Sequence, residues 1–447
     1  MTTTTVRELA RNTPGTRDRY ADLLRVASLA TVVCGHWLMA AVTAEGRVGN
    51  LLAALPGLQV LTWVLQVMPV FFFVGGFAHA LTFRSLRRRL PARSLYAAFL
   101  HGRSRRLLAP TAVFVLVWTA AALVAAVLGA DRGPVGAALR LVAQPLWFIG
   151  VYLAVVALTP PLLRLHERAG AWVPLALAGA VAVVDLLRFA LGVPYVGFLN
   201  FALVWLAVHQ LGFLRADGMI RRPGLLAAAG LAGAAALVAL GPYPLSMVGM
   251  PGEEVSNMAP PTLALLCHAL WLVGAVELLR GPGTRLAGRA RVWRAVVAAN
   301  GVAMTAFLWH LTAMLGVYAA LLAVGAPLPA PATGAWWAQV PPRLAAAAVF
   351  TALLVAVFRR FEVPGASGAS PRPGSGPLAA VGAALCLFGV LGLSLVGFGG
   401  ILDGRTAVLV AVPVSAPAAL AVVLGGWLLV ARAARPSPPA GSDPRRH

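Results

Sequence analysis

The stretch YADLLRVASLATVVCGHWLMAA, residues 20–41, decides the fold, because it is a long apolar run with one arginine and one histidine inside it. About twenty such residues, at about 1.5 Å each, cross the roughly 30 Å hydrocarbon core of a bilayer as an α-helix. We therefore expect an all-α fold, a polytopic transmembrane bundle of about twelve helices. The predicted spans are roughly 22–43, 58–83, 107–130, 141–163, 171–190, 198–214, 224–241, 260–280, 295–324, 342–358, 378–399 and 407–431.

The composition excludes a soluble globular enzyme. Of the 447 residues, 60% are hydrophobic and only 11% are charged, and the mean hydropathy is +0.83. Charged side chains are too few to cover a water-soluble surface of this size. The three cysteines lie in apolar runs at unrelated spacings, so we expect neither a disulfide framework nor a metal site.

The positive charge of the chain carries a topology signal. All 36 basic residues are arginines, and against 14 acids they give a net charge of +22. With a cytoplasmic N-terminus, the predicted inside segments hold 29 arginines and the outside segments five. Cytoplasmic loops are enriched in basic residues, so we expect both termini in the cytoplasm and the protein in the cell membrane. The bilayer is then the expected partner, and nucleic acid is not.

One clear linker divides the chain, a stretch rich in Pro, Gly and Ser from Glu362 to Pro377. The polar N-terminal segment predicts no cleavable signal peptide, so the first helix would itself direct insertion. The predicted organisation is a cytoplasmic N-terminal segment (1–21), a ten-helix membrane domain (22–358), a cytoplasmic linker (359–377), a two-helix C-terminal appendage (378–431) and a disordered cytoplasmic tail (432–447).

Ionisable residues within spans are functional candidates, because charge is costly in hydrocarbon. Arg25 and His36 are eleven residues apart, which is three helical turns plus about 20°, so they share one face about 16 Å apart along the axis. Asp22 can pair with Arg25 at the cytoplasmic end, whereas His36 lies in the outer half. The pattern indicates a channel lined by this face. The alternative is an arginine that reaches the interface and a hydrogen-bonded core histidine.

His310 is the second catalytic candidate. It lies near the middle of the ninth predicted span, at a depth that allows it to approach His36, although a packed core histidine is the alternative. The other ionisable residues inside spans are expected to be structural: His79, His209, His268, and the pairs Asp185 with Arg188 and Glu277 with Arg280.

A second concentration of charge precedes the third predicted span. Eight arginines and no acid occur between the second and third spans, and the series ends in Arg103-Ser104-Arg105-Arg106. At three-residue spacing, Arg103 and Arg106 would share a helix face and could grip a phosphate or pyrophosphate. The alternative is anchoring to anionic lipid.

Three features in this order resemble the membrane acyltransferase 3 family of polytopic O-acyltransferases. Asp22-x-x-Arg25, followed by ten residues and His36, is similar to the start of the family's first helix. The run PVFFFVGGF at 69–77 resembles its Phe-Phe-x-x-Ser-Gly-Phe signature, with Gly75 in place of the usual Ser, and Arg103 to Arg106 resembles its Arg-x-x-Arg. Weaker similarities to family motifs are LWF at 146–148 and LWH at 308–310. The similarity spans about residues 17–358.

The resemblance implies an acyl transfer, with cytoplasmic acyl-coenzyme A (acyl-CoA) as donor substrate and no bound cofactor. The acyl group, acetyl or another short chain, would pass to a hydroxyl of a glycan, cell-wall or natural-product acceptor at or beyond the outer face. Arg103 and Arg106 would hold the coenzyme A phosphates, and Arg25 would guide the arm toward His36. His36 would then serve as a general base, which we favour, or as a transient acyl carrier.

Acceptor contacts are expected in the two longest outer loops. These are 242–258, with Glu253, Glu254 and Asn257, and 325–341, with Trp336 and Trp337. A proton-coupled transporter or exporter is the main alternative, since it too would have twelve helices and buried histidines. A non-catalytic membrane sensor or scaffold is a third interpretation.

Overall fold

The computed structural model describes residues 3–42, 48–130, 133–250, 253–362 and 376–433. The protein is 77% helical, and the two β-ribbons among the described residues are short antiparallel pairs. The predicted all-α membrane fold is therefore confirmed. Most of the predicted linker (363–375) and of the predicted tail (434–447) lies outside the described residues.

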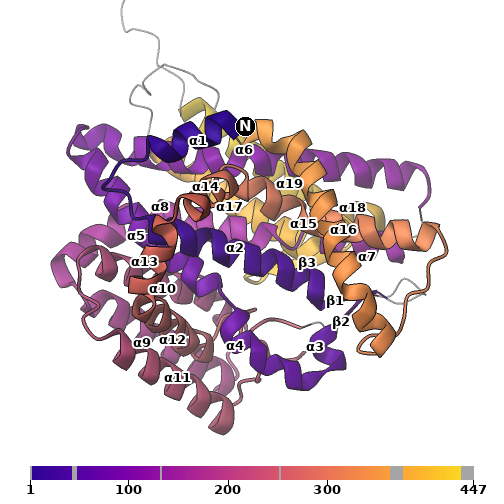
Figure 1. Ribbon diagram of the computed structural model, residues 1–447, viewed down its shortest axis with the longest axis horizontal. Coiled ribbons are helices and arrows are strands. Elements are labelled where there is room, and N and C mark those ends of the chain that lie inside the picture. The colour runs from indigo at the N-terminus through magenta and orange to yellow at the C-terminus, as the bar shows by residue number, and fades with distance from the viewer. Residues whose placement is uncertain (1–2, 43–47, 131–132, 251–252, 363–375, 434–447) are drawn as a thin grey trace, which may run out of the picture.

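The first half of the chain contributes α1 to α10 to the bundle. Figure 1 shows α2 crossing the middle of the view, with α5 and α13 near its N-terminal end and β1 and β2 at its other end. The elements are α1 (Thr3–Arg11), α2 (Arg19–Met39), β1 (Ala40–Val42), β2 (Val48–Asn50), α3 (Leu51–Ala54), η1 (Pro56–Leu61), α4 (Thr62–Leu65), α5 (Met68–Arg87), α6 (Ala92–Val127), α7 (Pro134–Leu141), α8 (Leu146–Ala169), α9 (Trp172–Phe189), η2 (Val196–Leu199) and α10 (Asn200–Ala216).

The second half contributes α11 to α19 and shares the main hydrophobic core with the first half. Its elements are α11 (Pro223–Leu240), α12 (Leu263–Leu278), α13 (Arg280–Gly288), α14 (Ala290–Asn300), α15 (Ala303–Ala323), α16 (Gly334–Phe358), η3 (Arg359–Phe361), α17 (Gly376–Val396), α18 (Gly400–Asp403), β3 (Thr406–Leu409), β4 (Val412–Ser415) and α19 (Ala416–Ala433). Within the described chain, 11 helical segments are long and apolar enough to cross a membrane. The pair α12 and α13, bent by 58°, would make a twelfth span.

Several predicted spans differ from the structure in their bounds. The second is not one helix, because α4 ends at Leu65 and α5 begins at Met68. Pro69 occupies the first turn of α5, where its missing N–H costs no hydrogen bond. The third begins earlier than predicted, at Ala92, so Arg103 and Arg106 lie within α6 itself rather than before it.

The ninth and twelfth predicted spans are interrupted. The ninth breaks at Gly301 between α14 and α15. The Glu362 carboxylate accepts the backbone N–H groups of Met304 and Thr305, each at 2.9 Å, and so caps the new helix start with a negative charge. The first part of the twelfth forms the hairpin β3–β4, in a segment where valines alternate with other residues as in a strand.

Two glycines allow α5 and α10 to cross in direct backbone contact. A Cβ at Gly76 would overlap the backbone oxygen of His209, and one at Gly212 would overlap the backbone oxygen of Phe73. Only glycine fits at such a crossing. The aromatic core lies beside it, where the rings of Phe72 and Trp205 stack with centroids 4.6 Å apart.

The C-terminal helices pack against the bundle. The side chain of Leu391 on α17 faces Gly150 on α8, where a Cβ would crowd it, and Phe398 meets Phe114 and Trp118 of α6. Cys386 and Leu393 of α17 are fully buried and belong to the main hydrophobic core. The pair α17 and α19 therefore shares its core with α6 and α8.

Candidate active site

Helix α2 carries the two residues that the sequence singled out. It is one unbroken helix from Arg19 to Met39, and the Asp18 carboxylate caps it by accepting the backbone N–H of Ala21 at 2.9 Å. Because the helix is continuous, Arg25 and His36 lie on one face as predicted.

A buried ion cluster fixes the N-terminal end of α2. The Arg215 guanidinium of α10 is almost completely buried and lies 3.0 Å from Asp18 and 3.1 Å from Glu277 of α12. The Tyr20 hydroxyl donates to the Val276 carbonyl oxygen at 2.6 Å. Breaking a buried charge cluster of this kind is costly, so α2 is held rigidly against α10 and α12.

Arg25 does not pair with Asp22, contrary to the expectation from their spacing. The Asp22 carboxylate instead binds Arg17 at 2.6 Å, and this hydrogen bond raises the pKa of the Arg17 guanidinium. Arg25 lies over the ring of Phe71, 5.7 Å from its centroid, and forms no ion pair with any described carboxylate. Its charge is therefore available to a ligand.

A cavity of about 350 Å³ joins the predicted donor-binding residues. Arg25, Arg103 and Arg106 all line it, although they come from two helices. Arg103 donates a hydrogen bond to the Thr82 hydroxyl, a neutral acceptor that leaves its charge uncompensated. Three guanidinium groups with no described carboxylate partner thus converge on one hollow, an arrangement that favours an anion.

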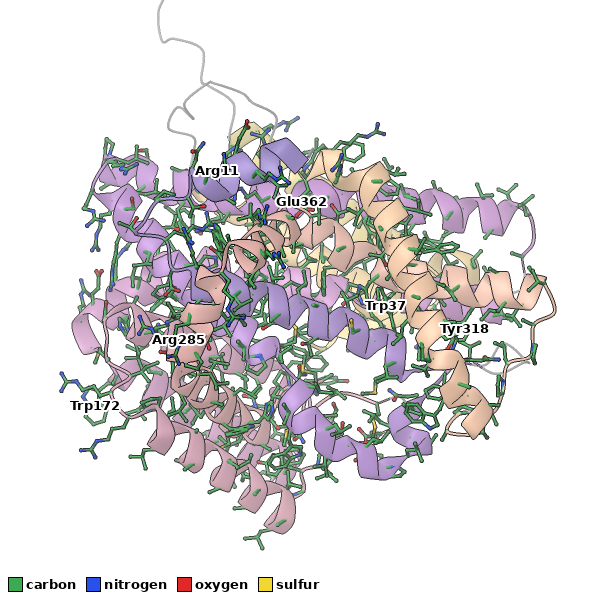
Figure 2. All side chains as sticks on the ribbon, in the orientation of Figure 1. Arg11, Trp37, Trp172, Arg285, Tyr318 and Glu362 are labelled. Carbon is green, nitrogen blue, oxygen red and sulfur yellow. The ribbon has the colours of Figure 1, made fainter. Side chains whose placement is uncertain are left out.

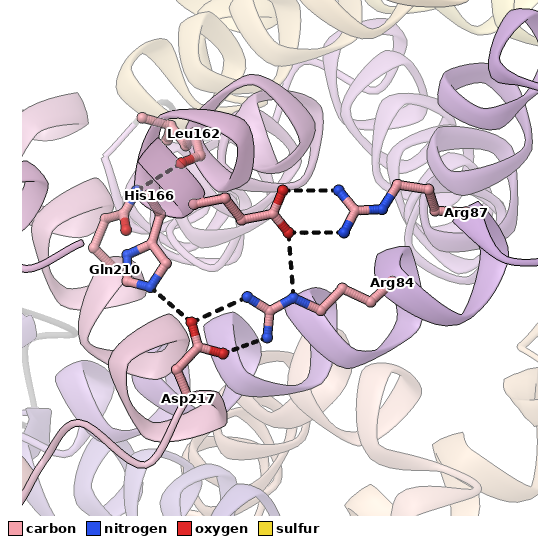
Figure 3. A network of polar contacts seen from close by, with 7 residues as sticks. Arg84, Arg87, Leu162, His166, Gln210 and Asp217 are labelled. Carbon is pink, nitrogen blue, oxygen red and sulfur yellow. Dashed lines mark hydrogen bonds and ion pairs between the residues drawn. The ribbon is translucent and has the colours of Figure 1, made fainter. Parts of the chain in front are cut away.

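The neighbouring arginines of α5 are occupied by carboxylates. Arg84 lies 2.5 Å from Asp217 and 3.5 Å from Glu167, and Arg87 lies 2.8 Å from Glu167. Figure 3 shows Arg84 and Asp217 pointing toward one another. The hydrogen bond from Arg84 lowers the pKa of the Asp217 carboxyl. These arginines are already neutralised, as is Arg17 at the cavity by Asp22, which separates them from Arg25, Arg103 and Arg106.

The aromatic signature of α5 forms part of the cavity wall. Gly75 lines the cavity, and a Cβ there would meet the ring of Tyr152 at 3.6 Å, which is ordinary contact. Gly76, by contrast, makes the backbone crossing with α10. The two glycines of the signature thus have different roles: the first leaves space in the cavity, and the second permits the helix packing.

Beneath the cavity lies a buried polar chain. The Tyr152 hydroxyl, at the cavity wall, is 3.0 Å from His79 Nε2, and His79 Nδ1 is 3.1 Å from His209 Nε2. Both histidines are fully buried. The structural role predicted for them stays a prediction, and their contacts agree with it because they hold the tyrosine in place.

His36 and His310 meet at the other end of α2. Their rings stack with centroids 5.0 Å apart, and His36 Nδ1 lies 2.7 Å from His310 Nε2. His310 Nδ1 lies 2.5 Å from the Phe307 carbonyl oxygen. His310 is fully buried, whereas His36 is exposed, so a substrate can reach only the His36 ring.

These contacts fix the tautomers of the two neutral rings. The Phe307 carbonyl oxygen can only accept, so His310 carries its proton on Nδ1 and presents Nε2 as an acceptor. His36 must then donate from Nδ1, which leaves its Nε2 unprotonated. That nitrogen makes no hydrogen bond to any described residue, so it is a free base on the accessible ring.

Aromatic rings separate the cavity from the histidine pair. The Phe71 ring beneath Arg25 meets Phe148 at 5.1 Å, Phe148 meets Phe307 at 4.9 Å, and Phe307 stacks on His310 at 5.7 Å between centroids. The arginine-lined cavity and the His36 ring therefore lie at two ends of one face of α2, with a continuous apolar wall between them.

Comparison with known families points to the same region. The profile of the acyltransferase domain family, acyltransferase 3, matches residues 18–359. The chain belongs to this family. The match begins at the residue that caps α2 and ends just after α16, so it contains the cavity and the histidine pair and leaves out α17 to α19. Neither the curated proteins nor the solved structures gave a match to the chain.

The acyltransferase places the remaining sequence candidates outside this site. Asp185 accepts hydrogen bonds from Asn200, Tyr243 and the Leu263 backbone rather than forming a direct ion pair with Arg188. Glu277 lies closer to Arg215 than to Arg280, at 3.1 Å against 3.9 Å. The His268 ring lies 3.0 Å from the Trp63 carbonyl oxygen, and the described residues form no cluster suited to a metal.

The loop residues expected to meet an acceptor divide into two groups. Asn257 is buried and donates to the carbonyl oxygens of Pro244 and Ser246, so it shapes its own loop. Burial raises the pKa of the Glu253 carboxyl in the same loop. The expected loop 325–341 ends earlier than predicted, because α16 begins at Gly334, so Trp336 and Trp337 lie on this helix. The Trp336 ring is buried, and it packs edge to face with Trp337. The roles of both loops in acceptor binding stay predictions.

The acyltransferase also has site residues that the sequence did not reveal. Tyr152 and Thr82 bound the cavity, and the Phe307 carbonyl and the Trp37 indole, which donates to the His310 carbonyl oxygen at 3.0 Å, hold the histidine pair. None of them is part of the motif that contains Arg25 and His36. The available signals were positional, because Phe307 lies one turn before His310 and Trp37 directly follows His36.

Proposed function

We propose that this membrane acyltransferase moves an acyl group from cytoplasmic acyl-CoA to an acceptor hydroxyl at the opposite face of the cell membrane. The carrying observation is that Arg25, Arg103 and Arg106 line one cavity at the foot of the helix that presents His36. The proposed acyl group is acetyl or another short chain, and a glycan, cell-wall or natural-product hydroxyl is the acceptor class.

The cavity suits the donor because coenzyme A carries several phosphate charges. Guanidinium forks bind phosphate oxygens with paired hydrogen bonds, and a low-dielectric wall strengthens each of them. The excess of arginine in the predicted cytoplasmic segments supports placing this cavity on the cytoplasmic side. The aromatic wall of α5 and α8 then offers an apolar path for the pantetheine arm toward His36.

The free Nε2 of His36 supports a general-base role. It takes the proton of the acceptor hydroxyl as that oxygen attacks the thioester carbonyl carbon. The carbon–sulfur bond then breaks, and the departing sulfur takes the proton from Nε2 as coenzyme A leaves as its free thiol. His310 acts as a positioning residue in this scheme, because it holds the tautomer of His36 without touching the reacting atoms.

The first test measures thiol release from acyl-CoA by purified protein in lipid, with a mixture of hydroxyl acceptors. The His36→Ala variant should lose release and remain folded. Cys34→Ala is the matched control, because Cys34 is accessible on the same helix and lies about 200° around it from His36. Full activity of the His36→Ala variant would overturn the proposal. Transport of intact acyl-CoA with no release would favour a carrier.

The second test addresses the donor cavity. Replacing Arg103 and Arg106 with Gln should raise the KM for acyl-CoA by about 10- to 100-fold, at about 1.5–3 kcal/mol for hydrogen bonds to charged groups. The matched control replaces Arg88 and Arg89, which are exposed and do not line the cavity. An equal effect of the two double variants would return the Arg103 pair to a lipid-anchoring role.

A further inference from the structure

A second, smaller pocket lies beyond the histidine pair. Its walls come from the end of α2, from α15 and from α16, and its volume is about 20 Å³. A space of this size takes a group of a few atoms and not a whole sugar ring. Trp37, Tyr318 and Arg343 supply its aromatic and polar lining.

Arg343 brings a positive charge into this pocket. It donates to the Tyr318 hydroxyl at 2.8 Å and to the carbonyl oxygens of Trp336 and Gln339, both at 3.3 Å. Its guanidinium also lies 4.8 Å from the centroid of the Trp336 ring. All these partners are neutral, and within the part of the chain that the structure describes no carboxylate forms an ion pair with it.

An uncompensated guanidinium in a membrane-spanning helix is expensive, and it calls for a counter-charge. The structural alternative is that the aromatic rings suffice to hold it. That alternative leaves two N–H groups of the Arg343 guanidinium without an acceptor and its positive charge without a counter-charge, and the same side chain lines the pocket. A carboxylate or phosphate in the pocket would satisfy both.

The pocket lies next to the histidine pair. Trp37 follows His36 in the chain, binds the backbone of His310 through its indole N–H, and lines the pocket. Tyr318 lies eight residues after His310 on α15, about 12 Å along the helix. Figure 2 shows Trp37 and Tyr318 toward one end of the molecule, with Arg285 toward the other.

We propose that this pocket binds an anionic group of the acceptor, a carboxylate or phosphate held by Arg343, while an acceptor hydroxyl lies at His36 Nε2. The inference rests on the proposed acyl transfer and adds the acceptor class, a hydroxyl compound that bears a negative charge. Arg343 contacts Tyr318, which lies about 12 Å along α15 from His310, and one or two sugar units or an extended headgroup can bridge such a separation.

The experiment compares acceptors that differ only in charge. Acetyl transfer from acetyl-CoA is measured to methyl glucuronide and methyl glucoside, and to glycerol 1-phosphate and glycerol, with the full-length protein in neutral phosphatidylcholine nanodiscs. The wild type should prefer the charged member of at least one pair by about 10- to 100-fold in KM. The two pairs separate a carboxylate acceptor from a phosphate acceptor of the lipid-headgroup kind.

The variants assign this preference to the pocket. Arg343→Gln should raise the KM for the charged acceptor and leave the KM for acetyl-CoA unchanged, and Arg343→Lys should keep part of the preference. Arg405→Gln, which removes an exposed arginine away from the pocket, is the matched control. If Arg343→Gln does not fold, the lysine variant and the wild-type preference decide.

The outcomes separate the two proposals. His36-dependent thiol release without a charge preference, or with a preference that survives in Arg343→Gln, overturns the acceptor pocket and keeps the acyltransfer. Release that does not depend on His36, or no release with any acceptor, overturns the proposed function and this assignment with it.

Discussion

Replacing His310 separates positioning from chemistry at the histidine pair. His310 Nε2 accepts a hydrogen bond from His36 Nδ1 at 2.7 Å, and the Phe307 carbonyl oxygen fixes the tautomer of His310. His310→Ala removes that acceptor and leaves the His36 N–H without its partner. His310→Gln places an amide oxygen, another acceptor, in the same region. The two variants therefore differ in the one hydrogen bond of interest.

The size of the effect follows from this hydrogen bond. A buried donor left without a partner costs about 1–3 kcal/mol, and about 1.4 kcal/mol is a factor of ten, so His310→Ala should lower kcat/KM by roughly 5- to 160-fold. A residue that itself transfers the proton contributes about 10²- to 10⁴-fold. We expect His310→Gln to keep most of the wild-type activity and His36→Ala to have none.

The assay is thiol release from acetyl-CoA at saturating acceptor, with kcat and KM measured separately and folding checked by thermal unfolding in the same lipid. If His310→Ala is as inactive as His36→Ala in folded protein, and His310→Gln gives no rescue, the positioning role is refuted. His310 would then act directly on the substrate or as the second member of a proton-transfer pair.

Three further predictions concern the scaffold. Gly76→Ala should lower the yield and melting temperature sharply, since its Cβ would overlap a backbone oxygen of α10, whereas Gly75→Ala meets only ordinary contact and should fold normally; equal melting temperatures would contradict the packing argument. The pKa of Asp217 is lowered in the folded protein, so its ion pair stabilises the fold at pH values above the unfolded pKa near 4, and this stabilisation is lost as the pH falls through the lower pKa of the folded state. The melting temperature of Asp217→Asn should therefore lie below that of the wild type at pH 7, and the difference should shrink toward pH 3. A difference that does not depend on pH would refute this. Deleting residues 376–447 should lower the melting temperature, because α17 shares the core with α6 and α8, yet keep thiol release measurable; loss of release in folded protein would place the terminal helices in the active unit.

Much of the architecture was predictable because it depends on short-range patterns. Runs of apolar residues gave the spans, and the unbroken helix α2 placed Arg25 and His36 on one face as their spacing required. The predicted breaks were less accurate. The break between Leu65 and Met68 and the break at Gly301 both fall within apolar runs, so a count of apolar residues passes over them.

The partners of charged groups were not predictable in the same way. Asp22 is three residues from Arg25, yet it binds Arg17, and the Asp185 carboxylate binds groups from three other segments. Sequence proximity shows which pairs are possible on one helix. Which pair forms depends on how neighbouring helices and turns bring competing donors to the same carboxylate.

The sequence by itself determined that this chain is a polytopic helical membrane protein and that one helix carries an arginine and a histidine on a common face. The tertiary structure alone decided that His310, 274 residues further along the chain, accepts a hydrogen bond from His36. It also decided that Arg25, Arg103 and Arg106 share one cavity. The reason is physical: helical periodicity is local, whereas a site built from several helices depends on close packing at crossings such as that of α5 and α10, which no single segment encodes.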